Sequence, residues 1–198
     1  MLLSKGACLT AGSLFGLTTS TGEIMSDEKI IQGINLSMRN FDEIDLSGTT
    51  FRKCNFQGAS FQNADLRNCE FLECNLVQVN FTNANLSNTN WMIVDSSMST
   101  FRRALMNNIS CDMYVDFKDC NFEDADLSGS DMRGARLTGS DMSHCDLRKC
   151  NFDNVSIQDS WLWYVKVEGS SWKDTCLDST QIKLVDSTIL PEQDTQHG

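Results

Sequence analysis

The chain has 198 residues, a length typical of one domain, and a formal net charge of −11 from 16 Lys and Arg against 27 Asp and Glu. This charge argues against direct nucleic-acid binding, because neutralising phosphates requires a surplus of basic side chains. The sequence has no apolar run of about 18 residues, so it predicts no transmembrane segment, and its 40% hydrophobic content is enough for a folded core.

The first segment, residues 1–24, is rich in Ser, Thr and Gly and has no acidic residue before Glu23. It weakly resembles a secretory signal, but Lys5 shortens its apolar stretch and no A-x-A cleavage site follows. Three interpretations stay open: a flexible leader, a type III-style export segment, and an upstream start before a true first residue at Met25. We expect residues 1–25 to form a flexible leader.

The following part of the chain repeats every five residues. An apolar residue, here called the central residue, occupies every fifth position from Leu36 to Trp91. The pattern weakens at Ser96 and returns at Phe101, Met106 and Cys111. One extra residue then shifts it, and the second run extends from Phe117 to Ile182. The residue two positions before the central one is nearly always small, and Gly or Asn commonly stands two positions after it.

A period of five fits neither a straight helix nor a straight strand. On a helix the central residues would spiral around every side, and on a strand they would alternate between the two faces. They share one interior only if the chain turns once per repeat. Gly and Asn accept the positive φ that such corners require, so each quintet is predicted to be a short extended piece followed by a corner.

The blocks ADLRN, ANLSN, ADLSG and CDLRK resemble the pentapeptide repeat family over about residues 31–185. The resemblance implies an all-β fold, a right-handed quadrilateral parallel β-helix (solenoid) with four quintets per coil. About seven to eight coils would form a domain over residues 26–186, and residues 187–198 would form a polar C-terminal tail. At a spacing of twenty, one predicted interior column contains Phe41, Phe61, Phe81, Phe101 and Phe122, and another contains Leu46, Leu66, Leu86, Met106, Leu127 and Leu147.

Six of the nine cysteines occupy the small position before a central residue. Cys69 with Cys74, and Cys145 with Cys150, have a C-x4-C spacing at the loose edge of structural zinc patterns. Packing as small buried side chains is the favoured interpretation, with a metal site or a disulfide as the alternative. Abundant thiols also favour a reducing compartment, so we expect a cytoplasmic protein. We predict neither a metal nor another cofactor.

The sequence shows no phosphate loop and no nucleophile motif, and we predict a protein that is not an enzyme. His144 lies near Asp141 and Asp146 in the sequence, but its position predicts a solvated corner side chain. Asp and Asn residues directly before central residues are interpreted as hydrogen-bond acceptors for corner backbone rather than as catalytic acids. These residues are Asn55, Asp65, Asn75, Asn85, Asp126 and Asp146.

Two surface features point to a protein partner. Residues 112–146 contain nine acidic and three basic residues, and aromatic side chains surround Leu162. Acidic residues beside aromatic ones make a plausible docking surface, although Arg102 and Arg103 are placed to pair with two of the acids. The C-terminal segment with Leu184 and Ile189 is an alternative cover for the aromatic residues. The predicted partner surface consists of Glu123, Asp124, Asp141, Trp161, Trp163 and Tyr164.

The family resemblance also implies a function. Acidic members mimic duplex DNA and bind type II topoisomerases such as DNA gyrase, so one expectation is a non-enzymatic DNA mimic. Two features of the quinolone-resistance branch are missing, namely long loops between coils and an apolar C-terminal helix. The alternative is a secreted bacterial effector that uses the rod as a scaffold for a host protein. Residues 92–116, where the repeat falters, are expected to form either a distorted coil or a binding loop.

Overall fold

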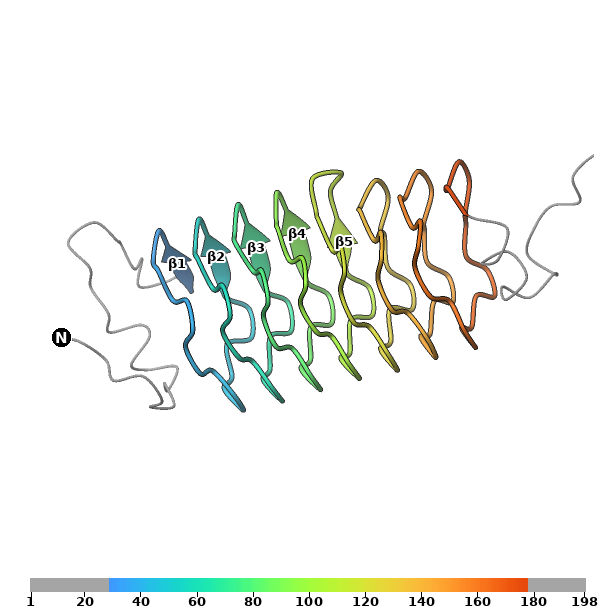
Figure 1. Ribbon diagram of the computed structural model, residues 1–198. Helices are drawn as coiled ribbons and strands as arrows, with labels where there is room; N and C mark the ends of the chain where they lie inside the picture. The colour runs from blue at the N-terminus through green and yellow to red at the C-terminus, as the bar shows by residue number, and fades with distance from the viewer. Residues whose placement is uncertain (1–28, 178–198) are drawn as a thin grey trace, which may run out of the picture.

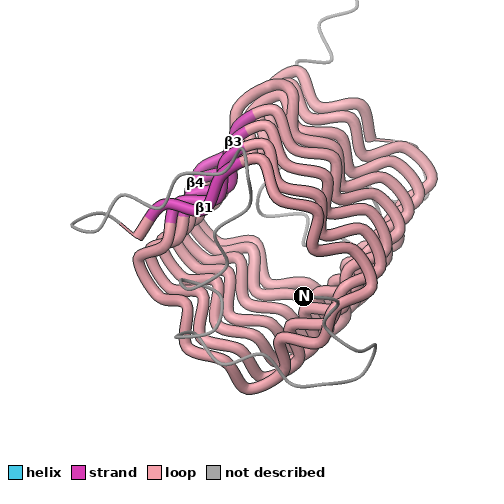
Figure 2. The backbone as a smooth tube through the Cα atoms, turned by 90° about the vertical axis from the view of Figure 1, so that its left-hand side faces the viewer, coloured by secondary structure: helices cyan, strands magenta, loops and turns pink. Residues whose placement is uncertain are grey.

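The structure is a computed structural model that describes residues 29–177. These residues wind into a four-sided parallel solenoid, seen from the side in Figure 1 and along its axis in Figure 2. One side carries a five-stranded parallel sheet in which each strand pairs with the next along the chain. The strands are β1 (Ile30–Gln32), β2 (Thr50–Arg52), β3 (Glu70–Leu72), β4 (Asn90–Met92) and β5 (Ser110–Cys111).

The pairing register confirms the predicted coil of four quintets. Ile31 pairs with Phe51, and Phe51 with Phe71, so one coil takes twenty residues. The other three sides are joined by isolated parallel bridges, such as Ser60 with Asn80, whose spacing is also twenty except where they span the extra residue after β5. The described residues contain no helix, so the all-β prediction is confirmed. The predicted leader, the first and last residues of the repeat domain and the tail lie outside the described residues.

Hydrogen bonds between coils explain why a five-residue unit is stable. The N–H of Phe61 donates to the carbonyl of Asn80 at 2.7 Å, and the N–H of Asn80 donates to the carbonyl of Ala59 at 3.0 Å. The N–H of Ala64 donates back to the carbonyl of Phe61 at 3.0 Å and closes the turn. Each corner therefore satisfies its backbone within its own turn and against the neighbouring coils.

Corner backbone adopts positive φ, as the Gly and Asn pattern predicted. Gly129 and Asn63 have φ values of 73° and 58°. The same conformation also occurs at residues that disfavour it, including Met98 and the β-branched Ile93 at 58° and 55°. Such residues cost roughly 1–2 kcal/mol each in this region. The bonds to neighbouring coils therefore outweigh the local preference of individual residues.

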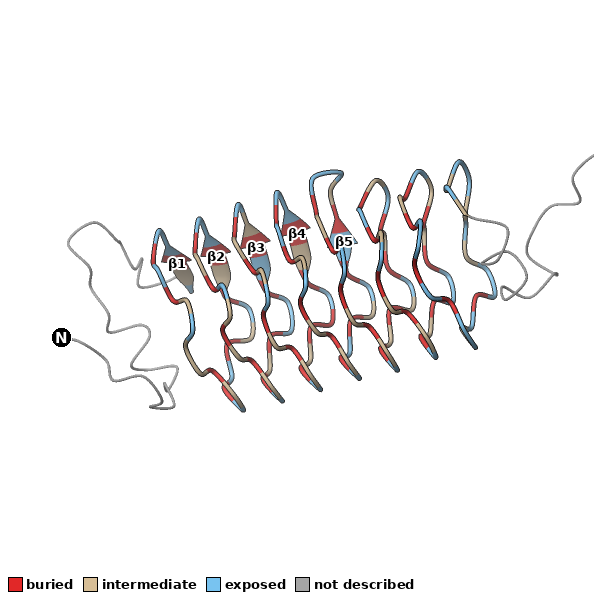
Figure 3. Cartoon of the chain, viewed as in Figure 1, coloured by how far each residue is buried: buried red, intermediate tan, exposed pale blue. Residues whose placement is uncertain are grey.

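The interior is filled by columns of central side chains, and Figure 3 shows buried segments recurring from coil to coil along the rod. The predicted phenylalanine column is present, with its members fully buried. Consecutive rings stack with centroid distances of 4.7, 5.5, 5.0 and 4.8 Å. The predicted leucine and methionine column is buried too. Each coil thus buries its apolar face against its neighbours.

The repeat shifts by one position because one extra residue enters the corner after β5. Trp91 pairs with Cys111 at a spacing of twenty, whereas Asp95 pairs with Asp116 at twenty-one. The Oδ1 of Asp112 accepts the N–H of Ile93 at 3.2 Å and that of Tyr114 at 3.0 Å. In the preceding coil the N–H equivalent to that of Ile93 donates to a backbone carbonyl instead of a carboxylate. Residues 92–116 therefore form a coil with a one-residue bulge, not a loop.

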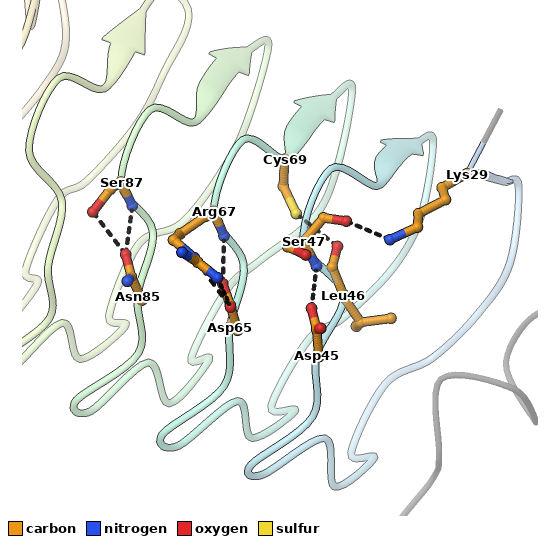
Figure 4. Close-up of polar contacts among 9 residues, drawn as sticks. All are labelled: Lys29, Asp45, Leu46, Ser47, Asp65, Arg67, Cys69, Asn85 and Ser87. Atoms are coloured by element: carbon orange, nitrogen blue, oxygen red, sulfur yellow. Dashed lines mark hydrogen bonds and ion pairs between the residues drawn. The ribbon is translucent and has the colours of Figure 1, made fainter.

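Acidic and amide side chains before central residues bond to the corner backbone, as predicted. Figure 4 shows Asp65 and Asn85 accepting the N–H of Arg67 and Ser87, both at 3.1 Å. The same bond, at 2.9–3.2 Å, is made by Asn55, Asn75, Asp126 and Asp146. These residues therefore hold the corners, which is a structural role.

We expect Asp65→Ala to lower the free energy of unfolding by about 1 kcal/mol, the usual contribution of one hydrogen bond. Asp65→Asn should cost less, because the amide oxygen still accepts the N–H of Arg67, as Asn85 does for Ser87 one coil further on. Unfolding in urea at pH 7 measures both changes. Equal losses in the two variants would show that the backbone bond is not what matters.

The same variants predict a pH dependence. The bond from the Arg67 guanidinium lowers the pKa of the Asp65 carboxyl. A lowered pKa stabilises the folded chain at pH values above the ordinary carboxyl pKa of about 4. This contribution disappears as the pH falls through the lowered pKa. The stability advantage of the wild-type chain over Asp65→Asn should therefore shrink on acidification below about pH 4. An advantage that is constant down to acidic pH would contradict this assignment.

Candidate partner-binding surface

The six predicted surface residues lie on one side of the rod, the side that carries the phenylalanine column. Trp161 and Trp163 flank the buried Leu162 and point outward, because alternate residues of an extended segment face opposite ways. Asp141 is the bridge partner of Trp161 one coil earlier. Glu123 and Asp124 lie two coils before Trp163, roughly 10 Å away along the axis. Asp141 therefore lies next to the aromatic residues, whereas Glu123 and Asp124 lie too far along the rod to contact them.

The aromatic side chains are largely exposed. Trp161, Trp163 and Tyr164 expose 60%, 55% and 76% of their surface. Large exposed rings gathered on one coil are typical of partner surfaces rather than of solvated corners. The segment that was the alternative cover, with Leu184 and Ile189, lies outside the described residues.

A fourth ring joins this group. His144 occupies a corner, as predicted, but its imidazole stacks on Tyr164 with a centroid distance of 5.1 Å and an interplanar angle of 12°. The backbone N–H of His144 also donates to the backbone carbonyl of Trp163 at 2.7 Å. The spacing of twenty between His144 and Tyr164 was the sequence signal that could have revealed this contact. We name Trp161, Trp163, Tyr164 and His144 the aromatic corner.

The acids two coils away are neutralised by basic residues of the coil before them. Arg102 pairs with Glu123 at 3.0 Å, and Arg103 pairs with Asp124 at 3.5 Å. The sequence analysis gave this pairing as the alternative to a role of these two acids in partner docking. The aromatic corner therefore has Asp141 as its nearest predicted acid, and the Oδ1 of Asp141 accepts the N–H of Ser143 at 2.9 Å.

Ion pairs also reduce the acidic field of residues 112–146. Six of the nine acids in this stretch lie within ion-pair distance of Lys or Arg. They are Asp116, Asp119, Glu123, Asp124, Asp131 and Asp146. Duplex DNA, in contrast, presents phosphates without covalently attached counter-charges. The local surface therefore resembles DNA less than its sequence composition indicates.

A second apolar surface surrounds the bulge. Ile93, Met113 and Tyr114 expose more than half of their surface. A depression of about 480 Å³ lies beside Ile93 and Tyr114, and Glu73, Cys74 and Asp95 contribute to its lining. This surface sits two corners away from the aromatic corner around the coil. It therefore offers an internal comparison for any experiment on the aromatic corner.

Residues 29–177 contain neither a metal-binding cluster nor a membrane-spanning helix. No group of three or more His, Cys, Asp or Glu side chains in that part of the chain is placed to hold a metal ion. No helix there has the length and hydrophobicity needed to span a membrane. The cysteines predicted at the small position are buried, and their Sγ atoms donate to carbonyls of the previous coil, as in Cys145 to Phe122 at 2.9 Å.

Comparison with known proteins identifies the repeat. A family model described as "Pentapeptide repeat region" matches residues 34–110, and one described as "Pentapeptide repeats (8 copies)" matches residues 116–154. The interval between the two matches contains the bulge after β5. No curated protein matches the chain in a sequence search.

Three solved structures are similar to the chain. A trypsin-treated form of QnrB1, a plasmid-mediated fluoroquinolone resistance protein, has 21% identity and a TM-score of 0.45, covering 80% of this chain and 95% of that one. HetL from the cyanobacterium Nostoc has 18% identity and a TM-score of 0.30, covering 74% and 86%. Rfr23 from the cyanobacterium Cyanothece has 16% identity and a TM-score of 0.39, covering 75% and 88%.

Proposed function

The chain belongs to the pentapeptide repeat proteins, and from this membership we propose that it is a non-enzymatic rod that binds a protein partner through the aromatic corner. One observation carries the proposal: three large aromatic side chains on one coil each expose more than half of their surface. Trp and Tyr are the residues that most often dominate binding energy in protein interfaces. The filled interior of the rod supports a role for its outer surface.

The partner is proposed to recognise aromatic side chains more than a DNA-like field of charge. The net charge of −11 favours approach of a basic partner. Most acids of the acidic stretch are neutralised within the rod, so charge alone supplies little specificity. Exposed ion pairs of this kind are worth about 0–1 kcal/mol each, whereas a buried interface Trp contributes about 2 kcal/mol or more.

DNA gyrase is the first defined partner to test, because acidic members of the pentapeptide repeat family act on it. For a gyrase partner, purified protein at micromolar concentration should change supercoiling activity or its inhibition by a quinolone. Trp163→Ala should abolish that change, and Tyr114→Ala on the opposite corner should not. No effect of the wild-type protein at this concentration would exclude gyrase.

A cytoplasmic location is also proposed, since seven of the described cysteines are buried as free thiols, a state favoured by a reducing compartment. The alternative role as an exported effector depends on the composition of residues 1–24, which lie outside the described residues. Both roles use the same aromatic corner and differ in the cell that supplies the partner.

A further inference from the structure

Cys54 and Cys74 stand one above the other on neighbouring coils. Each precedes a central residue by two positions, and their chain neighbours Asn55 and Asn75 are parallel bridge partners. Among the cysteines of residues 29–177, this is the one pair stacked in this way. The C-x4-C pairs singled out in the sequence lie instead on adjacent sides of a coil.

The separation of the two residues suits a covalent bond between them. Neighbouring parallel segments lie about 4.8 Å apart, and disulfides join Cα atoms about 4.4–6.8 Å apart. The two side chains occupy the same position on successive coils, so their thiols face the same interior column. Their Sγ atoms also contact equivalent carbonyls, Ile31 for Cys54 and Phe51 for Cys74, both at 3.3 Å. The sulfur atoms are therefore held side by side before any reaction.

Cys54 differs from the other buried cysteines, Cys74 included, in the direction in which its pKa is shifted. The neighbouring Cys74 thiol lowers the pKa of the Cys54 thiol. Burial raises the pKa of Cys69 and of Cys150 to about 12. Thiolates are the reactive form of cysteine, so Cys54 is the preferred nucleophile. Cys74 lines the depression beside the bulge, which brings solvent close to the pair.

We propose that Cys54 and Cys74 form an oxidisable dithiol, a modification site that hydrogen peroxide converts into a disulfide linking the coil of β2 to the coil of β3. The Cys54 thiolate attacks one peroxide oxygen, the O–O bond breaks, and the departing hydroxide takes a proton to become water. The sulfur of Cys74 then attacks the resulting sulfenic acid and displaces a second water. Two thiols are oxidised and one peroxide is reduced.

The test treats the reduced full-length chain with hydrogen peroxide and measures intact mass and proteolytic peptides. The expected product has lost two hydrogens, and its cross-linked peptides contain Cys54 and Cys74. Cys54→Val and Cys74→Val should each abolish this loss, and Val is tolerated because Val94 and Val155 occupy the same column. Cys145→Ala is the matched control, since Ala125 precedes it in its own column, and it should still form the disulfide.

A second measurement separates the disulfide from unfolding of a variant. The oxidised wild-type chain should melt at a higher temperature than the reduced one, because a cross-link between coils restricts the unfolded chain. That difference should vanish in Cys54→Val. Folded chain that keeps all its thiols, stops at sulfenic acid, or cross-links other cysteines as readily would overturn the proposal.

Discussion

Replacing Phe61 by Asp is expected to unfold the rod, at least around the coil that begins with β2. Phe61 is fully buried, and its ring stacks between Phe41 at 4.7 Å and Phe81 at 5.5 Å. The substitution removes these contacts, which alone cost about 3–5 kcal/mol. It also buries a carboxylate without a partner, which costs several kcal/mol more. The combined loss approaches or exceeds the whole stability of about 5–15 kcal/mol typical of a domain.

Thermal unfolding followed by circular dichroism measures this effect. Asn63→Asp is the matched control, because it adds the same charge two residues away at an exposed corner where the chain itself places Asp124. The control should melt within a few degrees of the wild-type chain. A melting temperature unchanged in Phe61→Asp would show that this side chain does not lie in the interior.

Replacing Trp163 by Ala is expected to weaken partner binding at least tenfold while changing stability little. The indole exposes 55% of its surface in the free protein, so its loss removes little packing from the rod. In a complex the same ring would be desolvated, and truncating a central interface Trp costs about 2 kcal/mol or more. The affinity for the protein partner and the melting temperature are measured on the same variant.

Tyr114→Ala is the control for this experiment. Tyr114 is exposed by 66%, similar to the rings of the aromatic corner, but it lies at the bulge two corners away. Its replacement should leave binding unchanged. If Trp163→Ala instead lowers the melting temperature and its folded fraction binds normally, the indole serves stability rather than recognition.

The interior could be predicted from the sequence because it depends only on the repeat length and the number of residues in one coil. Once the chain turns every five residues and closes a coil after twenty, the neighbours of Phe61 follow by arithmetic, and Phe41 and Phe81 are found there. The role of Asp65 at its corner follows in the same way, since its partner is two residues away.

The surface was less predictable because its contacts depend on side-chain conformation. The register places Arg102 near Glu123 but does not decide whether the pair forms or each residue stays in solvent. The bulge was located correctly, yet the use of the Asp112 carboxylate in place of a backbone carbonyl needed atomic positions. The spacing of twenty places His144 beside Tyr164, but the stacking of the two rings depends on both side-chain conformations.

Hydroxyl-radical footprinting of the rod with and without its bound partner tests the central claim most directly. The method reports the solvent exposure of Trp, Tyr and Met side chains, which occur at both the aromatic corner and the bulge. We predict that the partner protects Trp161, Trp163 and Tyr164 while Met113 and Tyr114 react as in the free protein. Protection at the bulge alone, or an unchanged reactivity of the aromatic corner in the complex, would contradict the proposed binding surface.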